Sequence, residues 1–174
     1  MLKFYDTAVT FSEFPDEIAI CANITNCPCN CDNCSEPWLK DDIGEVLDEE
    51  AIQKLLNEHK DCSVFGIMGG DSDQGDIIRI ADYIHSHSNL KVGFYSGRDY
   101  INIQLVPHLD YYKIGRWITP VGEVDKWPLT TCGPLQFPFT NQIYFQCIGD
   151  KLINCSHLFR KNPIHDLQRY VIAQ

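Results

Sequence analysis

Four of the nine cysteines in this chain fall within a short stretch, from Cys27 to Cys34, in the order Cys-Pro-Cys-Asn-Cys-Asp-Asn-Cys. Neighbours this close are poorly placed for disulfides with one another, because a disulfide needs Cα atoms roughly 4.4–6.8 Å apart and converging side chains. Thiolates gathered on one loop can instead surround a single soft metal centre. The spacing of Cys27, Cys31 and Cys34 lets three sulfurs point at a common centre, which predicts a metal site.

A structural zinc site is the main alternative for these cysteines, and it would make the chain a binding or interaction module without catalysis. Structural zinc is usually held by ligands from two paired half-sites. The cysteines that follow the cluster form no second Cys-x-x-Cys pair; they are Cys62, Cys132, Cys147 and Cys155. The spacing therefore favours the three-thiolate interpretation.

Length and charge limit the classes of protein to which the chain can belong. Its 174 residues, 44% of them hydrophobic, predict a single domain, 1–174, with a substantial buried core. The net charge of −10 argues against nucleic acid or an anionic membrane as a partner, because phosphate binding needs a positively charged surface.

The start of the chain bears on its location. Charged residues interrupt it at Lys3, Asp6, Glu13, Asp16 and Glu17, so it contains no apolar signal-peptide core. No apolar run approaches the ~18 residues that predict a membrane span. An odd number of cysteines without an export signal fits a reducing compartment, so we expect a cytoplasmic protein.

Strands and helices are predicted to alternate along the chain. Apolar runs predict strands at 18–24, 62–68, 91–97 and 111–115. Helical periodicity predicts helices at 48–59, 75–85 and 99–105. A hairpin is predicted from 141–147 and 151–155. This alternation favours an α/β fold with a parallel sheet, and because a complete βα barrel usually needs ~250 residues, we expect a partial (open) barrel with a C-terminal β-hairpin.

Loops that follow the predicted strands carry the candidate functional residues. The cysteine loop follows 18–24, Gly69-Gly70-Asp71 follows 62–68, and Ser96 stands near the end of 91–97. In α/β folds, active sites form at the C-terminal ends of parallel strands. Glycines there let the backbone approach a ligand, and the carboxylate of Asp71 can accept hydrogen bonds from an ammonium group.

The stretch 116–140 is irregular and rich in proline and aromatic residues. Long irregular stretches in compact domains tend to be functional or disordered, and the aromatic content argues against disorder. Two interpretations remain open for it: a loop that covers the site or docks a partner, and the ordinary packing of a long connection.

The cysteine spacing resembles the signature of the radical S-adenosylmethionine (radical SAM) enzymes. Gly69-Gly70-Asp71 is similar to the Gly-Gly-Glu/Asp motif of the same family. Within it, the chain resembles the activating proteins of anaerobic ribonucleoside-triphosphate reductases from about residue 18 to residue 144. Tyr95-Ser96-Gly97, the Lys-Ile-Gly at 113–115 and the Thr-Asn-Gln at 140–142 add to the resemblance, because they follow in the same order.

The resemblance implies both cofactors and their ligands. Cys27, Cys31 and Cys34 would hold three irons of a 4Fe-4S cluster, and the fourth iron would bind S-adenosylmethionine. Cys29 would be a bystander or at most an outer neighbour of the cluster. For the amino group of the cofactor, the implied contacts are Gly69, Gly70 and Asp71. Ser96 would be a weaker contact and Lys113 a partner for the cofactor carboxylate.

The implied reaction is a reductive cleavage. A reduced cluster would pass one electron to S-adenosylmethionine, and the resulting 5′-deoxyadenosyl radical would take a hydrogen from a glycine of the reductase. The implied partners are the anaerobic ribonucleoside-triphosphate reductase and a one-electron donor such as flavodoxin or ferredoxin. Another radical SAM reaction on a small molecule, such as that of a deazaguanine-forming synthase, is the alternative among enzymes.

Overall fold

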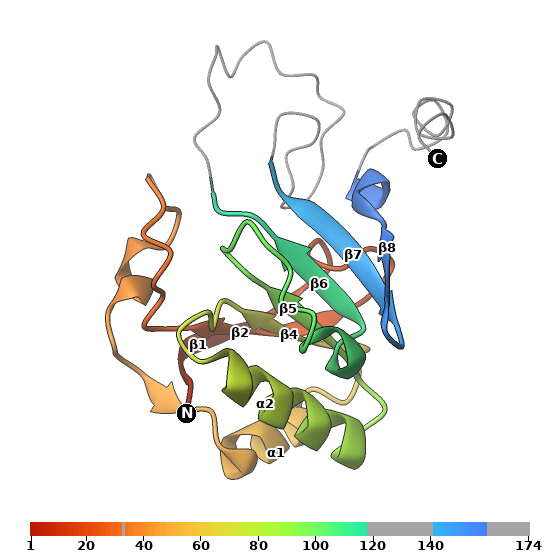
Figure 1. Ribbon diagram of the computed structural model, residues 1–174. Helices are drawn as coiled ribbons and strands as arrows, with labels where there is room; N and C mark the ends of the chain where they lie inside the picture. Colours follow the sequence, from red (N-terminus) through yellow and green to blue (C-terminus); the bar gives the residue numbers. More distant parts are fainter. Residues whose placement is uncertain (33, 118–140, 160–174) are drawn as a thin grey trace.

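A computed structural model describes residues 1–32, 34–117 and 141–159 (Figure 1). In this part of the chain, eight strands form one mixed sheet in the order β3-β1-β2-β4-β5-β6-β7-β8. The strands are β1 (Lys3–Thr10), β2 (Ala19–Ile24), β3 (Glu45–Val46), β4 (Val64–Met68), β5 (Lys91–Tyr95), β6 (Tyr111–Ile114), β7 (Ile143–Ile148) and β8 (Lys151–Asn154). The expected α/β class is confirmed, and the described strands form an open sheet with β3 and β8 at its edges.

The centre of the sheet is parallel and consists of β2, β4, β5 and β6. Strand β1 runs antiparallel to β2, and β7 runs antiparallel to β6. The C-terminal ends of the four parallel strands therefore lie at one end of the sheet. The loops predicted to carry function begin at this end, as expected for an α/β fold.

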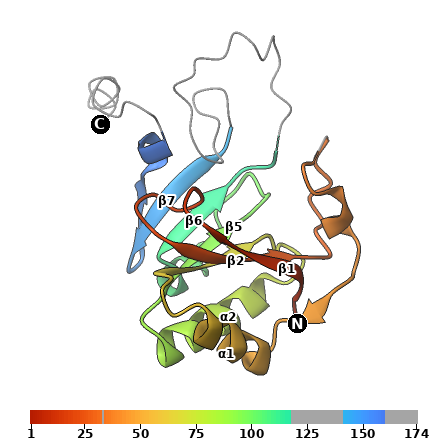
Figure 2. The ribbon, with the colours of Figure 1, turned by 180° about the vertical axis from the view of Figure 1, so that it is seen from behind.

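Both predicted helices before β5 are confirmed as α1 (Glu49–Glu58) and α2 (Gln74–His87). Each begins at an aspartate that caps it. Asp48 accepts a hydrogen bond from the Ala51 amide at 2.9 Å, and Asp73 accepts one from the Asp76 amide at 3.1 Å. Figures 1 and 2 show both helices on the same face of the sheet. Across the described ranges, no helix combines the length and the apolar character needed to cross a membrane.

The sheet separates two groups of buried side chains. The larger group fills the space between the sheet and the two helices. The smaller group, on the other face, is centred on aromatic rings, with Phe14 next to Tyr95, Tyr111 and Tyr144. Phe14 comes from the connection between β1 and β2, whose chain crosses this face (Figure 2).

Two glycines in the central strands make room for the Phe14 ring. A Cβ added to Gly66 of β4 would lie 2.8 Å from Phe14 Cε2, and one added to Gly93 of β5 would overlap the same ring. Such contacts are closer than a close-packed interior allows. Glycine is therefore required at both positions so that the Phe14 ring can pack against the sheet.

The prediction of a helix at 99–105 is wrong. The structure has turns there, followed by a short 3-10 helix, η2 (Val106–His108). The Asn102 side chain accepts a hydrogen bond from the Gln104 amide, and the Asn102 amide donates to the Tyr112 hydroxyl. Asparagine offers the backbone such local alternatives to helical hydrogen bonds, and here they prevail over the apolar periodicity.

The C-terminal hairpin is confirmed, because β7 and β8 pair antiparallel around Gly149 and Asp150. Gly149 has a φ of 60°, a conformation that glycine adopts without strain. Most of the irregular stretch predicted at 116–140 lies outside the described residues.

Candidate functional site

A cavity of about 460 Å³ lies at the C-terminal ends of the parallel strands. The residues that line it come from several separate segments. They include Cys34 of the cysteine loop, Gly69 after β4, Ser96 after β5, and Lys113 of β6. The structure therefore places residues from four predicted motifs around one space of the size that small ligands occupy. A larger hollow, of about 680 Å³, lies over α1 and Tyr83, away from the strand ends.

Local backbone geometry fixes the shape of the cysteine loop at its start. Asn26 and Asn30 have φ values of 56° and 46°, in the left-handed region that asparagine tolerates better than most residues. The Cys27 amide donates a hydrogen bond of 2.9 Å to the carbonyl of Leu39, which lies in the 3-10 helix η1 (Pro37–Lys40). The loop is thus held at its base by the segment that follows it.

The predicted metal ligands Cys27, Cys31 and Cys34 are all partly exposed free thiols. Burial raises the pKa of the Cys31 thiol, and the charges of Cys34 and Cys27 add to this rise. In the ranges that the structure describes, no three Cys, His, Asp or Glu side chains converge as metal ligands do. The set of donors fits an iron–sulfur cluster in kind, but these thiols do not adopt a coordinating arrangement.

Cys29 differs from the other three cysteines of the loop because it is buried. Contact with Cys27, burial and the charge of Asp71 all raise the pKa of the Cys29 thiol. The same contact holds the pKa of the Cys27 thiol below its usual range, and the positive charge of Arg98 acts in the same direction. Cys27 is therefore the more readily deprotonated of the two, as a metal ligand should be.

Asp71 lies at the centre of a hydrogen-bond network below the cavity. Its side chain is buried, and four donors reach its carboxylate. The Ser96 hydroxyl and the side-chain amide of Gln74 donate to Oδ1 at 2.7 and 2.9 Å. The backbone amide of Gly97 and the Cys29 thiol donate to Oδ2 at 2.7 and 3.4 Å. A carboxylate has about four acceptor positions, so this network fills them. Asp71 thus connects the cysteine loop to the turns after β4 and β5.

The two glycines before Asp71 have backbone conformations that other residues rarely adopt. Gly69 has a φ of 93° and Gly70 a φ of 113°. A Cβ on Gly70 would also lie 2.8 Å from Ile77 Cδ1 and 3.0 Å from Leu2 Cδ1. Gly69 lines the cavity, whereas Gly70 packs against the core below it. The structure therefore gives the two glycines different surroundings within one turn.

Lys113 is a buried lysine whose side chain faces the cavity. Its Nζ lies 4.1 Å from the centroid of the Tyr95 ring and 3.4 Å from Gln142 Oε1. Burial lowers the pKa of Lys113 to about 8, and the charge of Glu13 opposes this shift. In the described part of the chain, the Lys113 ammonium thus has the face of Tyr95, the amide oxygen of Gln142 and the more distant charge of Glu13 around it. An anionic group of a ligand would pair favourably with this ammonium.

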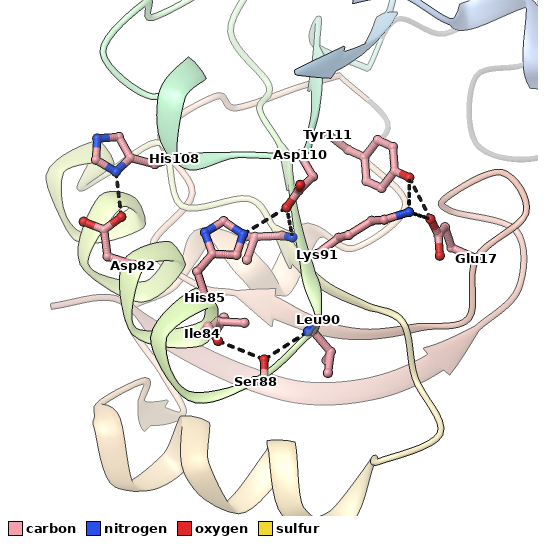
Figure 3. Close-up of polar contacts among 11 residues, drawn as sticks. Glu17, Asp82, Ile84, His85, Ser88, Leu90, Lys91, His108, Asp110 and Tyr111 are labelled. Carbon is pink, nitrogen blue, oxygen red and sulfur yellow. Dashed lines mark hydrogen bonds and ion pairs between the residues drawn. The ribbon is translucent and has the colours of Figure 1, made fainter. Parts of the chain in front are cut away.

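The opposite end of the parallel strands carries a second group of polar contacts (Figure 3). Lys91 and the Tyr111 hydroxyl both bond to Glu17, while Asp110 accepts from the Val92 amide and pairs with His85. Lys91 and Tyr111 begin β5 and β6, and Glu17 lies just before β2, so these contacts are separated from the cavity by the length of the strands.

Sequence reasoning missed two features of the site. Glu13 lines the cavity, and burial raises its pKa, but it belongs to a connection without strand or helix periodicity. Its backbone carbonyl accepts a hydrogen bond from the Tyr95 hydroxyl, which fastens the connection between β1 and β2 to β5. The other missed feature is the bond from Cys29 to Asp71, since cysteine spacing indicates ligands and not hydrogen-bond partners.

Comparisons with known proteins found no relative of this chain. A scan against family models gave no match, and neither did searches of curated proteins and of solved structures. Function is therefore inferred from the residues and geometry of the chain itself.

Proposed function

We propose that this chain is a radical SAM activase, which reductively cleaves S-adenosylmethionine at a 4Fe-4S cluster and generates the glycyl radical of an anaerobic ribonucleotide reductase. One observation carries the proposal: a single cavity is lined by Cys34, Gly69, Ser96 and Lys113, which come from four separate motifs. The resemblance noted in the sequence assigns these motifs to one cofactor site. Their common position at the strand ends supports that assignment.

The cluster would be held by Cys27, Cys31 and Cys34. Three thiolates leave one iron without a protein ligand, and an open position is what distinguishes a catalytic metal site from a structural one. When bound, the cluster supplies the electron for cleavage of the cofactor. The chain itself would contribute the thiolates.

S-adenosylmethionine would occupy the cavity. Lys113 carries the positive charge that the cofactor carboxylate needs, and its burial strengthens such a pair. Gly69 lines the cavity and would bring backbone close to the cofactor amino group without a side chain in the way, while Gly70 would shape the same turn from the core side. Asp71 and Ser96 contribute by holding the turns together, because the Asp71 oxygens are already occupied by internal donors.

The target would be a protein, because a cavity of about 460 Å³ is filled by the cofactor alone and leaves little room to enclose a second small molecule. The proposed partners are the anaerobic ribonucleoside-triphosphate reductase and a one-electron donor such as flavodoxin or ferredoxin. Both partners would be met in the cytoplasm.

The proposal is tested by anaerobic reconstitution with iron and sulfide, followed by dithionite and S-adenosylmethionine, with 5′-deoxyadenosine as the product measured. The wild-type chain should assemble a 4Fe-4S cluster and form the product. Cys31→Ala should do neither, whereas Cys62→Ala, which removes a partly exposed thiol outside the loop, should behave like wild type.

Two results would replace the proposal with its alternatives. Folded protein that retains tightly bound zinc and never cleaves the cofactor would make the cysteine loop a structural site. Cleavage that proceeds without formation of a glycyl radical when the reductase is added, as seen by electron paramagnetic resonance, would indicate a small-molecule substrate such as that of a deazaguanine-forming synthase.

A further inference from the structure

Cys29 lies at the point where the cysteine loop meets the turns after β4 and β5. Its side chain is buried, with the residue 9% exposed, and its Sγ is 3.4 Å from Asp71 Oδ2. It also rests against Gly97, because a Cβ added to Gly97 would be 2.6 Å from Cys29 Sγ and 3.0 Å from its Cβ. The sulfur therefore has a defined place in the packing and a defined acceptor.

The bond to Asp71 constrains what the Cys29 sulfur can do. The Cys29 sulfur lies within hydrogen-bond distance of Asp71 Oδ2 and against Gly97, so it faces the turns after β4 and β5. In this position the sulfur links the cysteine loop to those two turns.

We infer that Cys29 is a positioning residue, which fastens the cysteine loop to Asp71 and Gly97 and thereby holds the backbone that carries Cys27 and Cys31. The inference rests on the proposed function for its consequence, but the fastening itself is a property of the chain without any cofactor. Cys27 and Cys31 each stand two residues from Cys29, so fixing Cys29 fixes the backbone that carries both. Asp71 is suited to receive this contact because Ser96, Gln74 and Gly97 already hold its carboxylate in place.

The fastening is tested first by hydrogen exchange on the protein without cluster. Cys29→Ala removes the donor, so amide exchange over the loop, including the Cys27 amide bonded to Leu39, should become about fivefold faster. Cys29→Ser keeps a donor and should restore slow exchange in large part.

The positioning role is tested next on protein reconstituted with iron and sulfide. Both variants should take up as much iron as wild type, whereas Cys31→Ala should not. Binding of S-adenosylmethionine, measured by equilibrium dialysis, should weaken about fivefold in Cys29→Ala and recover in Cys29→Ser. Cys62→Ala is the matched control in both experiments.

Two outcomes would overturn the inference: exchange in Cys29→Ala that equals wild type, or a loss of bound iron in Cys29→Ser, which would make Cys29 a ligand. Failure of the proposed function is a separate result. If the wild-type chain takes up no iron, the function is wrong, while the exchange of the three proteins without cluster still decides whether Cys29 fastens the loop.

Discussion

The ammonium of Lys113 lies 4.1 Å from the centroid of the Tyr95 ring, inside the sheet and at the cavity. The ring face partly compensates a charge that has left water. The compensation is incomplete, since burial lowers the pKa of Lys113 from 10.5 to about 8. The chain therefore keeps a costly buried cation, as is common where a ligand completes the charge balance.

Replacing Lys113 with methionine is expected to stabilise the protein at pH 7. The folded protein binds the Lys113 proton more weakly than the unfolded chain does, so wild-type stability gains from this group as the pH rises from about 8 to 10.5. A shift of this size corresponds to about 3 kcal/mol as an upper limit, because one pKa unit is about 1.4 kcal/mol. Urea unfolding at several pH values should show the gain of Lys113→Met disappear across that interval.

The same variant should lose affinity for S-adenosylmethionine by about tenfold or more, because it removes the positive charge proposed for the carboxylate. Lys91→Met is the matched control, since Lys91 pairs with Glu17 at the far end of the strands (Figure 3). Unchanged affinity in Lys113→Met would remove Lys113 from the proposed site.

Lys91 itself leads to a prediction in the acid range. Burial would raise the pKa of Glu17, but hydrogen bonds from Lys91 and Tyr111 outweigh it and hold that pKa below 4.5. Stability from this carboxylate is therefore present above pH 4.5 and is lost as the pH falls below it. Because the Lys91 side chain is 48% exposed, Lys91→Met should cost less than about 1 kcal/mol at pH 7. Acid titration of the unfolding midpoint should show the two proteins converge.

Gly93→Ala is expected to destabilise the protein by about 1–3 kcal/mol, because the added methyl group would overlap the Phe14 ring. In a Phe14→Ala background, the same change should cost much less, since the obstructing ring is gone. Gly75→Ala is the control: its Cβ would lie 3.5 Å from Asp73 Oδ1, an ordinary contact, at the start of α2. Equal costs of Gly93→Ala in both backgrounds, measured by urea unfolding, would contradict the contact between Gly93 and the Phe14 ring.

Asp71→Asn is expected to lower the free energy of unfolding by about 2–3 kcal/mol. Both carboxylate oxygens accept hydrogen bonds, and the asparagine NH₂ group, a donor, would face donors in place of one of them. The same substitution should also speed exchange of the Gly97 amide, which donates to Asp71. Asp150→Asn, in the exposed turn between β7 and β8, should leave both quantities unchanged. Stability of Asp71→Asn equal to that of wild type would remove Asp71 from the centre of the network.

Regular elements with a buried face were predictable from the sequence, because burial imposes a period on apolar residues. Strand β4 and helix α2 are examples, and both were found close to their predicted bounds. Strand β1 was not predicted, since four of its eight residues are exposed and its pattern is mixed. The short β3 consists of exposed residues, and the sequence offers no periodic signal for it.

The site was predictable in part for a similar reason. Strand ends could be located, so Gly69 and Ser96 were expected to meet the cysteine loop, and the cavity brings them together. Contacts that depend on three-dimensional packing could not be read from spacing. Lys113 lies on β6, which is covered along one edge by the antiparallel strand β7, from much later in the chain. The hydrogen bond from Cys29 to Asp71 joins residues that are 42 positions apart.

The position of Phe14 limits what can reach the cavity from the sheet side. Its ring already packs over Gly66 and Gly93, so this face of β4 and β5 is covered. Under the proposed function, S-adenosylmethionine would take up the cavity, and the second reactant would have to offer one narrow group to it. A glycine at the tip of a protruding loop would have that shape, because its α carbon carries no side chain to hold the two molecules apart.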